Sequence, residues 1–182
     1  MKTLLHIAII ACVACACQEQ KPQGYTGNNT IIFYTDNLED EDQITQTFYW
    51  AAALNPDSEY DTCWVDVATV GDAVDYDREL KIVQDTAIGW NYLYDLVGNL
   101  VDSTSYIIPN QAVEGRHYVP FDDEGLQRFM VMPANTYRTQ IPIVMRRDPD
   151  NNHTLTLEIR LVDTPTAKIG ESRLSTCQIT IE

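Results

Sequence analysis

Apolar and polar residues alternate along much of this 182-residue chain after residue 30. The clearest run is Thr154–Val162, in which every second residue is a large aliphatic one and the residues between are Thr, Glu and Arg. A period of two predicts a strand with one buried face. The side chains expected to face the core are Leu155, Leu157, Ile159 and Leu161.

Residues 137–145 repeat this pattern, and Pro142 interrupts their polar side. Because proline cannot donate a backbone hydrogen bond, we expect an edge strand or a bulge there. Between the two runs, residues 147–152 contain the turn formers Pro, Asp and Asn, which predicts that the two strands form a hairpin. The residues of 137–145 expected to face inward are Tyr137, Thr139, Ile141, Ile143 and Met145.

Six further short runs read as strands, and no long amphipathic helix competes with them. Short strands at this spacing predict an all-β fold, an antiparallel β-sandwich of the immunoglobulin-like type, in a single domain over residues 30–182. Residues 85–110 are aromatic-rich without a clean period, so a strand pair, a short helix and a long loop all stay open. The six runs are Thr30–Thr35, Ile44–Ala53, Cys63–Val70, Arg78–Val83, Gln127–Met132 and Ser175–Ile181.

The N-terminus has the features of an export signal. Lys2 precedes an apolar run that is too short for a bilayer, and the polar QEQKPQ follows at once. A small residue before a Cys resembles the bacterial lipoprotein cleavage site, where the new N-terminal Cys is acylated. We expect a signal peptide over residues 1–16, lipidation at Cys17 and a flexible tether over 17–29. Cys12 and Cys15 remain alternatives, as does a plain signal peptide.

A lipid anchor predicts attachment to the outer membrane, on the cell surface or on the periplasmic side.

The charge is unevenly divided along the chain. Residues 17–115 hold 18 acidic and 3 basic residues, whereas residues 116–182 hold 9 acidic and 8 basic residues. Because such a field repels phosphate backbones, nucleic acid is excluded as a partner.

Four segments together resemble a lipoprotein family of Bacteroidetes, the domain of unknown function 4843. The segments are Thr62–Arg78, Ala112–Pro120, Met132–Ala134 and Leu155–Leu161. The resemblance implies a secreted lipoprotein, often encoded beside glycan-uptake systems, and it brings no enzymatic activity. The strand pattern is also similar to the β-sandwich repeats of calcium exchangers. Residues 85–111 are longer than the family pattern would suggest.

Catalytic motifs are scarce in this sequence. It contains no Gly-x-Ser-x-Gly, no His-Glu-x-x-His and no phosphate-binding glycine loop. Outside the signal, His153 lies beside a turn and should be solvated, whereas His117 begins a strand and should have a structural hydrogen-bonding role. We therefore expect a protein that is not an enzyme.

No cofactor is expected, with calcium as the one candidate. Acid-rich loops occur at residues 36–42, 72–77 and 122–124, and Ca²⁺ takes 6–8 oxygen ligands. The best set is Asp72, Asp75 and Asp77, although a solvated acidic surface explains the same residues. Asp77 could instead pair with the neighbouring Arg78.

Aromatic residues suggest a glycan platform. Trp90, Tyr92 and Tyr94 occupy alternate positions and could share one exposed face, or they could cover the core. Trp50 and Trp64 are expected to pack in the sandwich.

Two cysteines, Cys63 and Cys177, remain after processing at Cys17. Each lies an even number of residues from neighbours that are expected to face inward, so both cysteines should face the core. A disulfide and two buried free thiols are equally compatible with this pattern.

The sequence thus predicts a lipid-anchored, non-enzymatic binding or accessory module with a glycan or an envelope protein as partner. The alternative is a structural or adhesion module that engages proteins.

Overall fold

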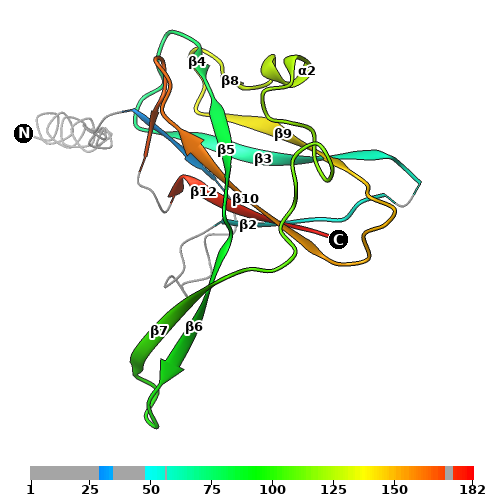
Figure 1. Ribbon diagram of the computed structural model, residues 1–182. Coiled ribbons are helices and arrows are strands. Elements are labelled where there is room, and N and C mark those ends of the chain that lie inside the picture. The colour runs from blue at the N-terminus through cyan, green and yellow to red at the C-terminus, as the bar shows by residue number, and fades with distance from the viewer. Residues whose placement is uncertain (1–28, 35–47, 56, 171–173) are drawn as a thin grey trace, which may run out of the picture.

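Two four-stranded sheets pack face to face in this protein (Figure 1). The computed structural model describes residues 29–34, 48–55, 57–170 and 174–182. The first sheet has the order β11 (Lys168–Ile169), β1 (Thr30–Phe33), β3 (Tyr60–Val70) and β9 (Arg138–Arg146). The second has the order β2 (Phe48–Ala52), β12 (Thr176–Ile181), β10 (Leu155–Val162) and β5 (Lys81–Asp85). The predicted all-β sandwich is therefore confirmed.

Strand directions are mixed at one edge of each sheet. Most neighbours are antiparallel, as predicted, but β1 and β11 run parallel, and so do β12 and β2. Both exceptions involve edge strands, which sit at the end of the strand order of their sheet. The rest of the ladder pairing is antiparallel throughout both sheets.

The core lies between the two sheets and follows the alternation of the sequence. Every second residue of β10 is buried, starting at Leu155, as predicted. Burial of aliphatic side chains of this size stabilises the fold by about 1.5–3 kcal/mol each. The completely buried aliphatic residues of the two sheets include Ile31, Val65, Val67, Ile141, Ile143, Leu157, Ile159 and Ile179.

The predicted hairpin between residues 137–145 and 154–162 is wrong, because β9 and β10 belong to different sheets. Their apolar faces pack against each other across the sandwich instead of lying side by side, and residues 147–154 cross from one sheet to the other. The edge position predicted from Pro142 is confirmed, since β9 ends its sheet. Tyr137, expected to face inward, is 58% exposed just before the strand begins.

Two other predicted strands are divided differently. Residues 78–83 form β4 (Arg78–Glu79) and β5, which are separated by the buried Leu80 and lie in different sheets. Residues 127–132 hold the end of a one-turn helix, α2 (Glu124–Gln127), followed by β8 (Val131–Met132), which pairs with β4. The Asp123 side chain accepts a hydrogen bond from the Gly125 amide and thereby caps α2.

Residues 85–110, which the sequence left open, form a strand pair. β6 (Ile88–Tyr94) and β7 (Leu100–Ile107) make a two-stranded hairpin that extends away from both sheets (Figure 1). The predicted signal peptide, the three candidate lipidation sites and the acidic segment 36–42 lie outside the described residues. Within the described residues, no helix has the length and apolar character needed to cross a membrane.

Candidate functional site

The β6–β7 hairpin is attached to the sandwich through a small set of hydrogen bonds. The Ile108 amide donates to the Ala87 carbonyl at 3.0 Å, which closes the base of the hairpin. The side-chain amide of Gln111 accepts from the Ala87 amide and donates to the Ile108 carbonyl, each at 3.0 Å. One glutamine therefore ties the two ends of the hairpin together.

Charged side chains of the second sheet secure the same region. The Glu158 carboxylate accepts a hydrogen bond from the Ile88 amide, and burial raises the pKa of this carboxyl group. Beside it, the guanidinium of Arg160 donates to Asp85, the last residue of β5, and this contact raises the pKa of Arg160. The hairpin base is thus tied to the second sheet, whereas no described strand of either sheet pairs with β6 or β7.

The three aromatic residues singled out in the sequence lie on one face of this hairpin. Trp90, Tyr92 and Tyr94 alternate along β6, which places their side chains on the same side of the strand. Trp90 and Tyr94 are 49% and 50% exposed, and Tyr92 is half-buried. Ser103 and Ser105 of β7 lie opposite Tyr92 and Trp90 and add hydroxyl groups to this aromatic face.

The opposite face carries one further aromatic ring. The Tyr106 side chain covers Gly89, so closely that a Cβ atom at residue 89 would lie 2.4 Å from the ring. A glycine is therefore required beneath Tyr106 unless the ring moves aside. This ring is 45% exposed and stands apart from the three rings of the aromatic face.

The tip of the hairpin is apolar around one ordered carboxylate. Asp95 accepts hydrogen bonds from the amides of Val97 and Asn99 and from the Asn99 side chain. These hydrogen bonds, with the Asn99 side chain foremost, lower the pKa of Asp95. Leu96 and Val97 are the most exposed large apolar residues, at 106% and 82%. The tip therefore presents apolar side chains beside a stable negative charge.

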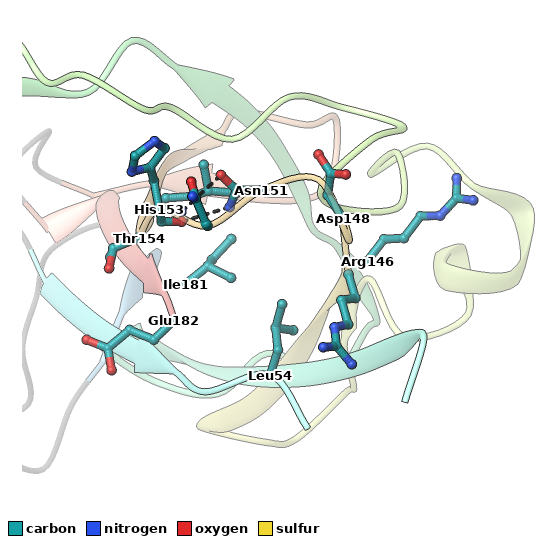
Figure 2. A pocket seen from close by; sticks show the side chains of 11 residues that line it. Leu54, Arg146, Asp148, Asn151, His153, Thr154, Ile181 and Glu182 are labelled. Atoms are coloured by element: carbon teal, nitrogen blue, oxygen red, sulfur yellow. Dashed lines mark hydrogen bonds between the residues drawn. The ribbon is translucent and has the colours of Figure 1, made fainter. Parts of the chain in front are cut away.

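A pocket of about 460 Å³ lies where the β9–β10 crossing meets the C-terminus (Figure 2). Ile181 lies in its middle, Asp148 and His153 lie along one side, and Leu54 lies on the opposite side. His153 is exposed, as predicted, and its carbonyl accepts from the Asn151 side chain at 2.7 Å. The pocket is lined by both apolar and charged groups, and its polar side chains do not point to a common position. The lining therefore suggests no reaction.

His117 and Asp148 form the arrangement that would be needed for general-base chemistry, but its atoms are already engaged. Nδ1 of the buried His117 accepts a hydrogen bond from the Val113 amide at 2.9 Å, and Nε2 lies 3.3 Å from Asp148. Arg116 donates to the same carboxylate oxygen at 2.7 Å. Burial opposes ionisation of Asp148, but the Asp150 amide, Arg116 and His117 together lower its pKa. The cluster fastens loop 113–117 to the β9–β10 crossing.

The candidate calcium residues do not gather into a site. Within the described residues no group of three His, Cys, Asp or Glu side chains could hold a metal ion. Asp72, Asp75 and Asp77 are all exposed, and the Asp77 carboxylate accepts from the Ala134 amide at 2.8 Å.

The Asp77–Arg78 ion pair that the sequence suggested is not formed. Arg78 is only 1% exposed, and its Nη1 donates to the Thr69 hydroxyl at 2.9 Å. Its Nε and Nη2 have no hydrogen-bond partner, and burial lowers the pKa of this guanidinium. Among the described residues, no carboxylate pairs with this buried cation.

Cys63 and Cys177 are free thiols on opposite sheets, and both pack in the core between the sheets. Burial raises the pKa of both, and the nearby Cys63 contributes to the rise at Cys177.

Trp64, expected in the core, is 45% exposed on the outside of β3. It packs edge-to-face on Phe129 with the ring centres 5.9 Å apart, and Arg128 lies over that ring. The alternation itself could have predicted this, because Cys63 and Val65 point inward and their neighbour must point outward. The Trp50 side chain lies outside the described residues.

Comparisons with known proteins give a likeness in fold and no match in sequence. No protein-family model matches this chain, and no curated protein matches it. Among solved structures, the apo form of the Calx CBD1 domain is similar, with a TM-score of 0.40 and 15% identity over 86% of this chain and 99% of that chain. At this score the likeness assigns no function. The resemblance to the domain of unknown function 4843 therefore stays an expectation.

Proposed function

We propose that this protein is a non-enzymatic binding module of the bacterial envelope that presents the β6–β7 hairpin to a glycan. The observation that carries the proposal is the exposed aromatic face of Trp90, Tyr92 and Tyr94. Aromatic rings bind the apolar faces of sugars, and neighbouring hydroxyl groups such as those of Ser103 and Ser105 provide hydrogen bonds. A link to glycan uptake, which the sequence resemblance implies, agrees with such a ligand.

The module would be anchored to the outer membrane by acylation of Cys17, with residues 18–29 as a tether. Labelling with a radioactive fatty acid tests this directly. The label should be lost in Cys17→Ser and retained in Cys12→Ser and Cys15→Ser. Loss in Cys12→Ser with retention in Cys17→Ser would move the anchor, and protease treatment of intact cells would distinguish the surface from the periplasmic side.

A second candidate is a structural or adhesion module that engages a protein. The apolar tip favours it, because Leu96 and Val97 are almost fully exposed and offer no hydrogen-bonding side chain to a sugar. In this case Leu96→Ser would weaken partner binding, whereas Trp90→Ala would have little effect on it.

A glycan array probed with the chain from Gln18 onward tests the leading proposal. The core residues that the structure describes all lie between Ile31 and Ile181, so this chain keeps them. Binding to at least one glycan class should fall about tenfold or more in Trp90→Ala. The matched control is Tyr106→Ala, which removes an aromatic ring from the other face of the hairpin.

The array is run with calcium and with a chelator, because the acidic loops were the sequence's calcium candidates. Failure to bind any glycan under both conditions, or equal losses in Trp90→Ala and Tyr106→Ala, would remove the aromatic face as the glycan site.

A further inference from the structure

The two strands of the hairpin pair only with each other among the described residues. A two-stranded hairpin is marginally stable in water, and three or more strands are usually needed for independent stability. Here both faces are exposed to solvent, and the hairpin and its tip carry ten exposed large apolar side chains. They are Ile88, Trp90, Leu93, Tyr94, Leu96, Val97, Leu100, Val101, Tyr106 and Ile107.

Among the described residues, no strand pairs with the outer edge of β6. Hydrogen-bonded and non-hydrogen-bonded pairs alternate along an antiparallel ladder. Because the Ile108 amide donates to the Ala87 carbonyl, the backbone groups of Trp90 and Tyr92 point away from β7. Two residues near the middle of β6 therefore offer amides and carbonyls to another strand.

This edge lacks proline and charge, two of the features that protect natural edge strands, and its one register irregularity lies at Leu93–Tyr94, beyond the segment from Trp90 to Tyr92. Proteins block exposed edges with lysine, proline, bulges or inward charges. β9, the edge of the first sheet, contains Pro142, but β6 contains neither proline nor any charged residue. β7 differs from β6 because Asp102 lies within it, and two such strands side by side would bring like charges together. Of the two free edges, β6 is the one that can pair.

A second copy of this chain fits the β6 edge best. Because β6 carries no charged residue, pairing it with itself about a two-fold axis places no like charges opposite each other within the strand. With the axis at Asn91, Trp90 of one copy lies opposite Tyr92 of the other, and aromatic cross-strand pairs stabilise a sheet.

We propose that two copies pair antiparallel through β6 about a two-fold axis at Asn91 and form a continuous four-stranded sheet. The axis is perpendicular to the sheet, so both aromatic faces lie on the same side. The dimer goes beyond the proposed glycan site and does not depend on it. Where a glycan does bind, the dimer doubles the platform and raises the avidity for repeating ligands.

Cysteine cross-linking tests this geometry in the chain from Gln18 onward. Asn91→Cys places the two new thiols opposite each other at the axis, at a Cα separation of about 4.5 Å that suits a disulfide. The matched control is Thr104→Cys, because Thr104 pairs with Asn91 on the same face but lies one strand further from the axis. Under mild oxidation Asn91→Cys should become a covalent dimer and Thr104→Cys should stay monomeric.

Wild-type measurements keep the test independent of the variants. Sedimentation at up to about 100 μM should show a dimer, and salt should tighten it several-fold, because two copies with net charge −15 repel each other. The amides of Trp90 and Tyr92 should exchange more slowly as the protein concentration rises. A monomer throughout this range, or equal cross-linking of both variants, would overturn the proposal.

Discussion

Replacing Arg78 with methionine should stabilise this protein. The guanidinium is 1% exposed, and its Nε and Nη2 have no hydrogen-bond partner. Within the described part of the chain no carboxylate pairs with either nitrogen, and the neighbouring Asp77 accepts a hydrogen bond from the Ala134 amide instead. Burying a cation without a counter-charge costs free energy in the folded state, and the lowered pKa of Arg78 has the same cause. Methionine has a similar length and carries no charge.

The magnitude follows from two opposing effects. Replacing buried ionic groups by apolar residues of similar volume often stabilises proteins by roughly 1–4 kcal/mol. The variant loses the hydrogen bond from Nη1 to Thr69, which is worth about 1 kcal/mol. We expect a net gain of up to roughly 3 kcal/mol, and for a chain of this length each kcal/mol raises Tm by about 2–4 °C.

Urea denaturation of the wild type, Arg78→Met and Arg78→Lys measures the effect. Arg78→Lys should be no more stable than the wild type, because it keeps the charge buried. A loss of more than about 1 kcal/mol in Arg78→Met, with an unchanged m value, would refute the reasoning. That result would mean that a counter-charge reaches the guanidinium in solution.

Three further predictions concern Tyr118, Asp148 and the two cysteines. Tyr118 is fully buried and its hydroxyl donates to Gln84 at 2.7 Å, so Tyr118→Phe should lower the free energy of unfolding by about 1–2 kcal/mol; an unchanged urea midpoint would contradict this. The lowered pKa of Asp148 means that its ionised form stabilises the fold above the unfolded pKa near 3.8 and that this contribution is lost as the pH falls through the folded pKa. A Tm series from about pH 7 to pH 3 should therefore fall less steeply in Asp148→Asn than in the wild type, and parallel curves would argue against the cluster. Because burial raises the pKa of Cys63 and Cys177, both should react slowly with a thiol reagent at about pH 8 in the folded protein and rapidly once it is unfolded; no reaction after unfolding would reveal a disulfide.

Alternation in the sequence was sufficient to predict the sandwich. β10 shows the reason, because each of its inward residues is buried and each residue between is only half-buried. Pro142 correctly placed its strand at an edge, since the constraint is local to one amide. Such features depend on the pattern within a single strand.

Which strands pair with each other was harder to predict from the sequence. The turn formers of residues 147–152 suit a tight hairpin and a crossing between sheets equally well, and only the packing of distant strands decides between them. The parallel pairing of β1 with β11 depends in the same way on residues that are far apart in the chain.

The sequence identified the aromatic residues of the candidate site but did not predict the hairpin that carries them. Trp90, Tyr92 and Tyr94 stood out, yet residues 85–110 showed no period because both faces of the hairpin are exposed and both contain apolar residues. Alternation of apolar and polar residues appears where one face of a strand is buried, and neither face of this hairpin is buried. The buried Arg78 was equally hidden, since its burial comes from strand β4 folding away from β5.

The closed base of the hairpin has an evolutionary consequence. Ala87 and Ile108 are joined by one hydrogen bond, and the Gln111 amide contacts both, so the residues between them enter and leave the domain at a single point. A segment of this kind can be lengthened, exchanged or deleted while the core stays as it is. The sandwich can then persist as a common scaffold while the hairpin diverges, and related chains would differ most between these two residues.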